Sequence, residues 1–276
     1  MIPPTTELAS GIDIPMLGIG MDQVRDFKQG YDALIYAFSI GYRSVDTAYS
    51  YGNEEAVGRA VRDCGIPRSE IFITTKLTMY DQGYDSALRA FDKSLKNLGL
   101  EYMDSFLIHW PGKYYFTDTW KAFIRLFEEK MIRAIGVCNF NIHHLEKLRE
   151  KTGVMPAINQ VEWHPYFQQP QIAKYCKQHN ILLEAWSPLM CGGEVLEDKH
   201  IVAISQEIGK SSAQVILRWH LQQGRRIFPK SVTPSRISEN LDIFDFDLTP
   251  TQIEVIDSMG VSDLRIGPDP DIFFLV

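Results

Sequence analysis

Several features that mark particular protein classes are missing from this sequence of 276 residues. It has no apolar run near the roughly 18 residues that would suggest a membrane-spanning helix. Its net charge of -7 argues against nucleic acid or an anionic membrane surface as the main partner. Four cysteines (Cys64, Cys138, Cys176, Cys191) form no CxxC pair, which disfavours a zinc knuckle or a thioredoxin-type redox site, so no metal is expected.

The chain also lacks a linker, a low-complexity run or a charged tail that would divide it. We therefore expect a single domain over residues 1–276. Four thiols in a chain of this size fit a reducing compartment, so we expect a cytoplasmic protein. We also expect it to act as a monomer.

Short β-branched runs alternate with longer amphipathic ones along the sequence. Strands are expected at 43–47, 71–76, 105–109, 132–137, 157–161, 182–185, 226–229 and, more weakly, 243–246. Helices are expected at 29–40, 54–64, 85–98, 118–130, 142–151, 170–179, 200–208, 213–222, 235–241 and 251–259. Regular alternation predicts a parallel sheet with helices outside it. Eight strands in a chain of about this length favour an α/β (β/α)8 TIM barrel, with an N-terminal β-hairpin at 6–16 closing the barrel floor.

A doubly wound open sheet is the competing architecture. Its usual fingerprint is GxGxxG after the first strand. The segment Gly18-Ile-Gly20 begins like that motif but lacks the third glycine, and no strand–helix–strand unit of about 30 residues surrounds it. The barrel is therefore the favoured fold.

Ionisable residues stand at the ends of three consecutive predicted strands. Asp46 ends the first, Lys76 the second and His109 the third, while Tyr51 follows Asp46 by five positions. Each residue alone has an ordinary structural explanation, but the carboxyl ends of barrel strands meet at one mouth, where barrel enzymes have their active sites. The conjunction therefore indicates a catalytic site.

These four residue types suit proton transfer to an oxygen atom. A tyrosine has an ordinary pKa near 10, and a neighbouring ammonium such as Lys76 favours the phenolate and lowers that pKa. Asp46 would hold Lys76 charged and positioned, His109 would donate a hydrogen bond to a carbonyl oxygen, and Tyr51 would act as a general acid. The set contains no nucleophile, so the chemistry calls for a hydride-donating cofactor.

The segment Gly41–Gly58, GYRSVDTAYSYGNEEAVG, resembles the signature of the aldo-keto reductases. The segments ITTK (73–76), FLIHWP (106–111), GVCNF (136–140), NQVEWHP (159–165), EAWSP (184–188) and PKSVTPSR (229–236) continue in the order of that family. The resemblance covers almost the whole chain. It implies a (β/α)8 barrel that reduces carbonyl compounds with NADPH, in which Tyr51 donates the proton, Lys76 and Asp46 tune it, and His109 orients the carbonyl.

The same resemblance implies a set of cofactor-binding residues. Asn139 and Gln160 would hold the nicotinamide carboxamide, and Trp186 would stack on the nicotinamide ring. Ser187 and Leu189 would follow the pyrophosphate. Around the adenosine 2′-phosphate the family places Lys230, Ser231, Arg236 and Asn240, with Val232 beside them. A guanidinium can hold a phosphate by two hydrogen bonds, which favours NADPH over NADH.

Candidate substrate-binding residues are His109, Trp110, Met21 and Tyr115, because aromatic side chains over a barrel mouth can bind a substrate body. The expected partner is a small-molecule carbonyl compound. The loop at 112–119 and the tail after Gly260 are short. In this the chain resembles the prokaryotic and protozoan branch of the family, which reduces small dicarbonyls and keto-sugars.

Two other functions fit parts of the sequence. In a barrel glycosidase, Glu162 and Glu184 after the fifth and sixth strands would form a carboxylate pair, but Tyr51, Lys76 and the 229–236 motif would then have no explanation. The second is a non-catalytic subunit that binds NADP(H) on the same barrel. The complete set of four residues counts against it.

Overall fold

A computed structural model describes residues 2–260 and 264–273 of the chain. Its strands are β1 (Thr5–Glu7), β2 (Asp13–Pro15), β3 (Ile19–Gly20), β4 (Ser44–Asp46), β5 (Phe72–Leu77), β6 (Met103–Ile108), β7 (Ile132–Cys138), β8 (Ile158–Glu162), β9 (Leu182–Trp186) and β10 (Arg226–Ile227). The helices are α1 (Phe27–Ile40), α2 (Glu54–Asp63), α3 (Tyr84–Leu98), α4 (Phe116–Glu128), α5 (Ile142–Thr152), α6 (Pro170–Gln178), α7 (Lys199–Ile208), α8 (Ser212–Gln222), α9 (Pro234–Leu241) and α10 (Pro250–Ser258). Each predicted helix boundary lies within two residues of the observed one.

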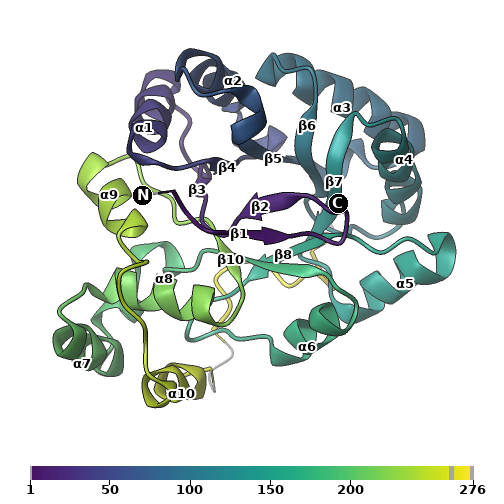
Figure 1. Cartoon of the computed structure of the whole chain (residues 1–276). Coiled ribbons are helices and arrows are strands. Elements are labelled where there is room, and N and C mark those ends of the chain that lie inside the picture. The colour runs from purple at the N-terminus through teal and green to yellow at the C-terminus, as the bar shows by residue number, and fades with distance from the viewer. Residues whose placement is uncertain (1, 261–263, 274–276) are drawn as a thin grey trace.

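The eight strands β3 to β10 form one parallel sheet in sequence order. Parallel bridges between Leu17 and Ile227 and between Gly20 and Lys230 join its two edges, so the sheet closes on itself. Figure 1 shows the helices arranged around this ring of strands. The predicted (β/α)8 barrel is confirmed.

The strand expected at 243–246 is wrong, because that segment is irregular chain between α9 and α10. The missing barrel strand is β3, in the glycine-containing segment set aside above. A Cβ on Gly18 would lie 2.8 Å from the ring of Phe228, and one on Gly20 would lie 2.7 Å from the Phe228 carbonyl oxygen. These glycines therefore allow the first and last strands to approach closely, and their lack of side chains hides the strand periodicity.

The N-terminal hairpin consists of the antiparallel strands β1 and β2. Leu8 and Ile14 of this hairpin share a buried cluster with Phe72 and Ile158, the first residues of β5 and β8. Figure 1 shows the hairpin lying across the middle of the ring. It packs at the amino ends of the strands, opposite the predicted site.

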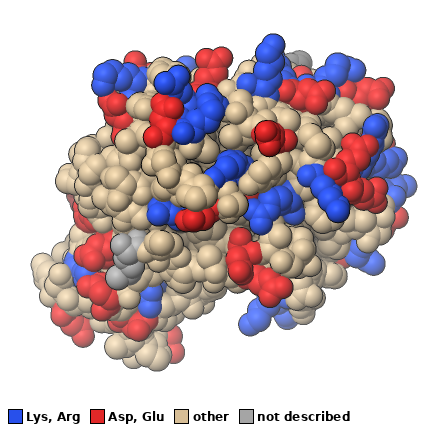
Figure 2. Space-filling view, turned by 45° about the horizontal axis from the view of Figure 1, so that its top comes forward, with Lys and Arg blue, Asp and Glu red and all other residues tan. Residues whose placement is uncertain are grey.

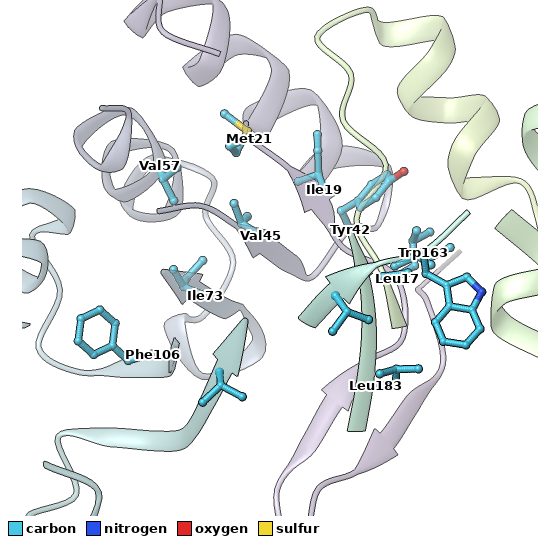
Figure 3. Packing of buried hydrophobic residues seen from close by; sticks show 14 of the residues in the cluster. Leu17, Ile19, Met21, Tyr42, Val45, Val57, Ile73, Phe106, Trp163 and Leu183 are labelled. Atoms are coloured by element: carbon cyan, nitrogen blue, oxygen red, sulfur yellow. The ribbon is translucent and has the colours of Figure 1, made fainter. Parts of the chain in front are cut away.

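Hydrophobic side chains fill the space between the barrel and its helices. Figure 3 shows Val45 of β4 and Ile73 of β5 near Val57 of α2; all three are fully buried in the main hydrophobic cluster. On α2, a Cβ on Gly58 would lie 1.7 Å from the Leu98 carbonyl oxygen at the end of α3. Only glycine permits that helix contact.

The outer surface carries charges of both signs. In the view of Figure 2, lysine and arginine side chains lie interspersed with aspartate and glutamate. Within residues 2–260 and 264–273, no helix is both long and apolar enough to cross a membrane.

Candidate active site

The four residues predicted from the strand ends meet at the carboxyl end of the barrel. The Lys76 ammonium donates to Asp46 Oδ2 at 2.6 Å, to the Thr47 carbonyl oxygen at 3.1 Å and to the Tyr51 hydroxyl oxygen at 3.3 Å. Tyr51 ends the short 3-10 turn Tyr49–Tyr51 that follows β4. The rings of Tyr51 and His109 meet edge to face, with 5.7 Å between their centres.

Burial and charge decide which of these groups hold protons. Burial is the largest single influence on Lys76 and lowers its pKa, but the charge and hydrogen bond of Asp46, together with Tyr51 and Cys138, outweigh it, so the pKa of Lys76 is raised above its ordinary value. Burial raises the pKa of Tyr51 by more than the Lys76 ammonium lowers it. The expected net lowering of the Tyr51 pKa is therefore wrong. Tyr51 stays a protonated phenol at neutral pH, which is the form that a general acid requires.

His109 is a neutral imidazole at this site. Burial, reinforced by the positive charge of Lys76, holds the pKa of His109 well below its ordinary value. Its Nδ1 lies 3.4 Å from the Ser50 hydroxyl oxygen. A neutral imidazole carries one N–H, so His109 can donate one hydrogen bond without adding charge next to Lys76.

A chain of buried polar groups inside the barrel holds Asp46 in place. Gln160 Nε2 donates to Asp46 Oδ1 at 2.8 Å and to Glu184 Oε2 at 2.9 Å. Glu184 also pairs with Arg226, and both side chains are fully buried. Arg226 Nη2 donates to the Ser44 hydroxyl at 2.5 Å. Neither Arg226 nor Ser44 was predicted as a site residue. The signal for Arg226 in the sequence is a charged residue at an inward position of a strand.

A cavity of about 710 Å³ opens above these residues. Asp46, Tyr51, His109 and Trp110 line it. So do nine of the ten predicted cofactor-binding residues: Asn139, Gln160, Trp186, Ser187, Leu189, Lys230, Ser231, Arg236 and Asn240. The fold thus brings residues in or after β7, β8, β9 and β10, and residues of α9, around one cavity.

Lys76 is fully buried and reaches the cavity through Asp46 and Tyr51, which line it. Three further predicted residues are not among those that line this cavity. Met21 is fully buried, and its Cε lies 3.3 Å from where a Cβ on Gly30 of α1 would stand; Figure 3 shows it in the core packing. Tyr115 is 59% exposed and packs against Tyr114. Val232 lines a separate surface pocket. Sequence spacing could not show that these side chains point elsewhere.

One end of the cavity carries amide groups and an indole. Trp186 Nε1 donates to Asn139 Oδ1 at 2.8 Å, and Asn139 Nδ2 donates to the His109 carbonyl oxygen at 3.1 Å. The Gln160 amide nitrogen is engaged inside the barrel, and the Cys138 thiol lies 3.7 Å from Gln160 Oε1. Burial raises the pKa of Cys138, so the thiol stays protonated. Gln160 thus offers its oxygen to a ligand as an acceptor.

The other end of the cavity is basic. Lys230 and Arg236 are exposed there, and Arg236 lies in the first turn of α9. Ser231 is buried, and its hydroxyl oxygen accepts from the Thr233 N–H at 3.1 Å. A helix N-terminus beside two cationic side chains is suited to an anion such as a phosphate.

Further lining residues went unrecognised in the sequence. Ser211 and Ser212 line the cavity at the start of α8, where Ser211 and Gln214 form a capping box. The S-x-x-Q spacing at 211–214 marks this helix start and could have drawn attention to it. Cys191 also lines the cavity, from the loop after β9, in a left-handed backbone conformation.

The carboxylate pair of the glycosidase alternative is not formed at the cavity. Glu184 is engaged by Arg226 and Gln160, and Glu162 accepts from two backbone N–H groups, of Ile266 and Gly267. Neither glutamate is among the residues that line the cavity. The structure therefore contradicts the glycosidase interpretation.

Known proteins resemble the chain over nearly its full length. It is 47% identical over 269 residues to 9,11-endoperoxide prostaglandin H2 reductase of Trypanosoma cruzi, covering 97% of this chain and 95% of that protein. It is 46% identical over 267 residues to glyoxal reductase of Bacillus subtilis, covering 97% and 96%. The crystal structure of a Gox0644 mutant in complex with NADPH superimposes with a TM-score of 0.94 at 40% identity, covering 100% of both chains.

The family model for the aldo/keto reductase family matches residues 16–260. This match runs from the segment between β2 and β3 to just past the end of α10, and it includes Asp46, Tyr51, Lys76 and His109. The chain belongs to the aldo/keto reductase family.

Proposed function

We propose that this protein uses NADPH to reduce small aldehydes and ketones, such as dicarbonyls and keto-sugars, to alcohols, with Tyr51 as the general acid. The observation that carries the proposal is the hydrogen-bonded row Asp46–Lys76–Tyr51 beneath a cavity that His109 also lines. The names of its relatives, a glyoxal reductase among them, support a small carbonyl substrate.

The cavity residues fit an extended dinucleotide with a phosphate at one end. Trp186 offers an indole face and Gln160 an acceptor oxygen for a nicotinamide carboxamide, while Lys230 and Arg236 beside the start of α9 suit a 2′-phosphate. Ser187 and Leu189 also line the cavity and would contact the pyrophosphate, which joins the two halves of the dinucleotide. When bound, NADPH supplies the hydride that the carbonyl carbon accepts. A structural neighbour crystallised with NADPH supports this choice.

The protein's own groups handle the proton. Neutral His109 donates a hydrogen bond that orients the carbonyl oxygen beside Tyr51. Tyr51 gives its phenolic proton to that oxygen as negative charge develops there. The Lys76 ammonium, 3.3 Å from the Tyr51 oxygen, stabilises the phenolate that remains. Asp46 acts through Lys76 and does not need to touch the substrate.

Trp110 is the aromatic residue best placed to contact the substrate body. It follows His109 directly, and it lines the cavity. His109 and Trp110 are 6.4 Å apart between ring centres and nearly parallel, at 24°. A compact carbonyl compound would lie between the rings of His109 and Trp110 on one side and Tyr51 on the other.

The test is NADPH oxidation with a panel of carbonyl compounds: methylglyoxal, phenylglyoxal, a diketo-sugar acid, simple aldehydes and a quinone. We expect Tyr51→Phe to lose nearly all turnover and to bind NADPH as before, because the aromatic ring stays in place and only the hydroxyl group that donates the proton is removed. Tyr49→Phe, in the same turn, is the matched control and keeps turnover.

Two outcomes would contradict the proposal. Unchanged turnover of Tyr51→Phe would remove the assigned role of the phenol. A wild-type protein that binds NADPH but reduces no compound of the panel would favour the alternative, a non-catalytic NADP(H)-binding subunit on the same barrel.

We further propose that residues 1–276 act as one domain and as a monomer in the cytoplasm. One chain supplies every group of the candidate site, and the four cysteines are free, as expected in a reducing compartment. Light scattering of the purified protein measures the monomer directly.

A further inference from the structure

The buried carboxylate of Glu162, at the end of β8, holds a part of the chain that is far away in sequence. We call residues 264–273 the tail. Glu162 is 1% exposed; its Oε1 accepts from the Ile266 N–H at 2.6 Å and its Oε2 from the Gly267 N–H at 3.0 Å. His164 Nε2 lies 3.1 Å from Oε1 as a third partner. One side chain thus holds the amides of two consecutive tail residues.

The tail packs behind two indoles that line the cavity. A Cβ on Gly267 would lie 2.4 Å from Trp186 Cη2 and 3.1 Å from Cζ2, so only glycine lets the tail lie against this ring. Phe273 packs against Trp110, with 4.6 Å between ring centres. No tail residue is among those that line the cavity. The tail therefore reaches the cavity through Trp186 and Trp110.

Further contacts fix the position of the tail and of Trp186. Trp186 Nε1 donates to Asn139 Oδ1, so Asn139 and Gly267 restrain the indole at two separate points. Between Gly267 and Phe273, Asp271 Oδ1 accepts from Asn141 Nδ2 at 2.8 Å, just before α5. The tail is thus attached to the rest of the chain both at the start of the segment that crosses from one indole to the other and within that segment.

We propose that Glu162 is a positioning residue for carbonyl reduction: by holding Gly267 against Trp186, its carboxylate sets the orientation of the indole next to the reacting groups. The proposal rests on the function proposed above and adds a residue outside the cavity. It also explains why a charged side chain occupies an inward position of β8 without lining the cavity.

Three variants separate this role from a general structural one. Glu162→Gln keeps the size of the side chain but places an NH2 group against a tail N–H, so one amide loses its acceptor. Gly267→Ala keeps Glu162 and forces the tail away from Trp186. Ile266→Ala is the matched control, because it removes a side chain that is 41% exposed and keeps the amide.

We expect Glu162→Gln and Gly267→Ala to lose about ten- to a hundredfold in kcat/KM for the best carbonyl substrate, mostly in kcat, since small displacements of groups at a reacting centre have effects of that size. NADPH affinity should change less than kcat/KM, because the displaced Trp186 contacts only the nicotinamide end while Lys230 and Arg236 are untouched. The near-ultraviolet circular dichroism of the tryptophans should change in both variants, and the Ile266 and Gly267 amides should exchange faster. Ile266→Ala should match the wild type in all four measurements.

Folded Glu162→Gln and Gly267→Ala variants with unchanged kcat/KM would overturn the positioning role. If Glu162→Gln does not fold, Gly267→Ala decides alone, because its change lies outside the barrel. A wild-type protein with no carbonyl reduction would refute the proposed function instead. In that case an unchanged tryptophan signal and unchanged amide exchange in Gly267→Ala would separately overturn the positioning of Trp186.

Discussion

Replacing Lys76 by methionine removes the cationic group that lies within hydrogen-bond distance of both Asp46 and Tyr51. Lys76 is fully buried, and methionine fills a similar volume without charge. Asp46 keeps its bond from Gln160 to Oδ1 but loses the 2.6 Å partner of Oδ2. Breaking a buried ion pair by removing one member costs about 3–5 kcal/mol. We therefore expect the free energy of unfolding to fall by about 3 kcal/mol at neutral pH, because the hydrogen bond from Gln160 to Asp46 Oδ1 relieves part of that cost.

The same substitution acts on catalysis by a different route. Burial raises the pKa of Tyr51, and Lys76 is the group that opposes this effect. Without the ammonium, the phenolate left after proton transfer is unsupported, so kcat should fall by about 10²- to 10⁴-fold, the usual worth of a general acid. Adding Asp46→Asn to Lys76→Met removes the unpaired carboxylate. The double variant should recover most of the stability and none of the activity.

Urea unfolding followed by tryptophan fluorescence and NADPH oxidation at saturating substrate measure the two effects separately. Asp46→Asn alone completes the cycle, since the energies of residues in contact do not add. The reasoning would be refuted by a Lys76→Met enzyme with wild-type kcat. It would also be refuted by a double variant whose loss of stability equals the sum of the two single losses.

The remaining predictions concern the cofactor and pH. Arg236→Ala should weaken NADPH binding far more than NADH binding, because only NADPH carries the 2′-phosphate; equal losses in fluorescence titrations would exclude that contact. Burial is the main cause that lowers the pKa of His144 to about 4. Below about pH 6.5, His144 therefore binds a proton in the unfolded chain but not in the folded chain. The free energy of unfolding should thus decline as the pH falls from about 6.5 to about 4. His144→Gln keeps an acceptor for the Asn141 N–H and should flatten this part of the stability curve in urea titrations at several pH values; an unchanged slope would contradict the shift.

Most of the fold could be predicted because local patterns carry it. Helix periodicity and caps placed the ten α-helices of residues 2–260 and 264–273, and seven of the eight barrel strands were readable as β-branched runs. The exception was β3, where Gly18 and Gly20 leave no side-chain pattern. The segment 243–246, between α9 and α10, was predicted as a strand because it contains Ile243, Phe244 and Phe246. These side chains pack against the hydrophobic core, and core packing uses the same residue types as a buried strand.

The sequence by itself determined that Asp46, Lys76 and His109 would meet. Each lies at or next to the carboxyl end of a strand of one parallel sheet, and parallel strands bring their carboxyl ends to the same side. Only the tertiary structure decided the rest. Whether Met21 and Tyr115 face the cavity depends on the direction of their side chains. The Glu184–Arg226 pair forms because these inward-facing residues of β9 and β10 lie at the same height along the barrel axis. The Tyr51 pKa depends on the balance of burial against one ammonium. The contact of Glu162 with residues 266–267 joins positions more than a hundred residues apart, where no local pattern can indicate that two backbone amides will find a carboxylate.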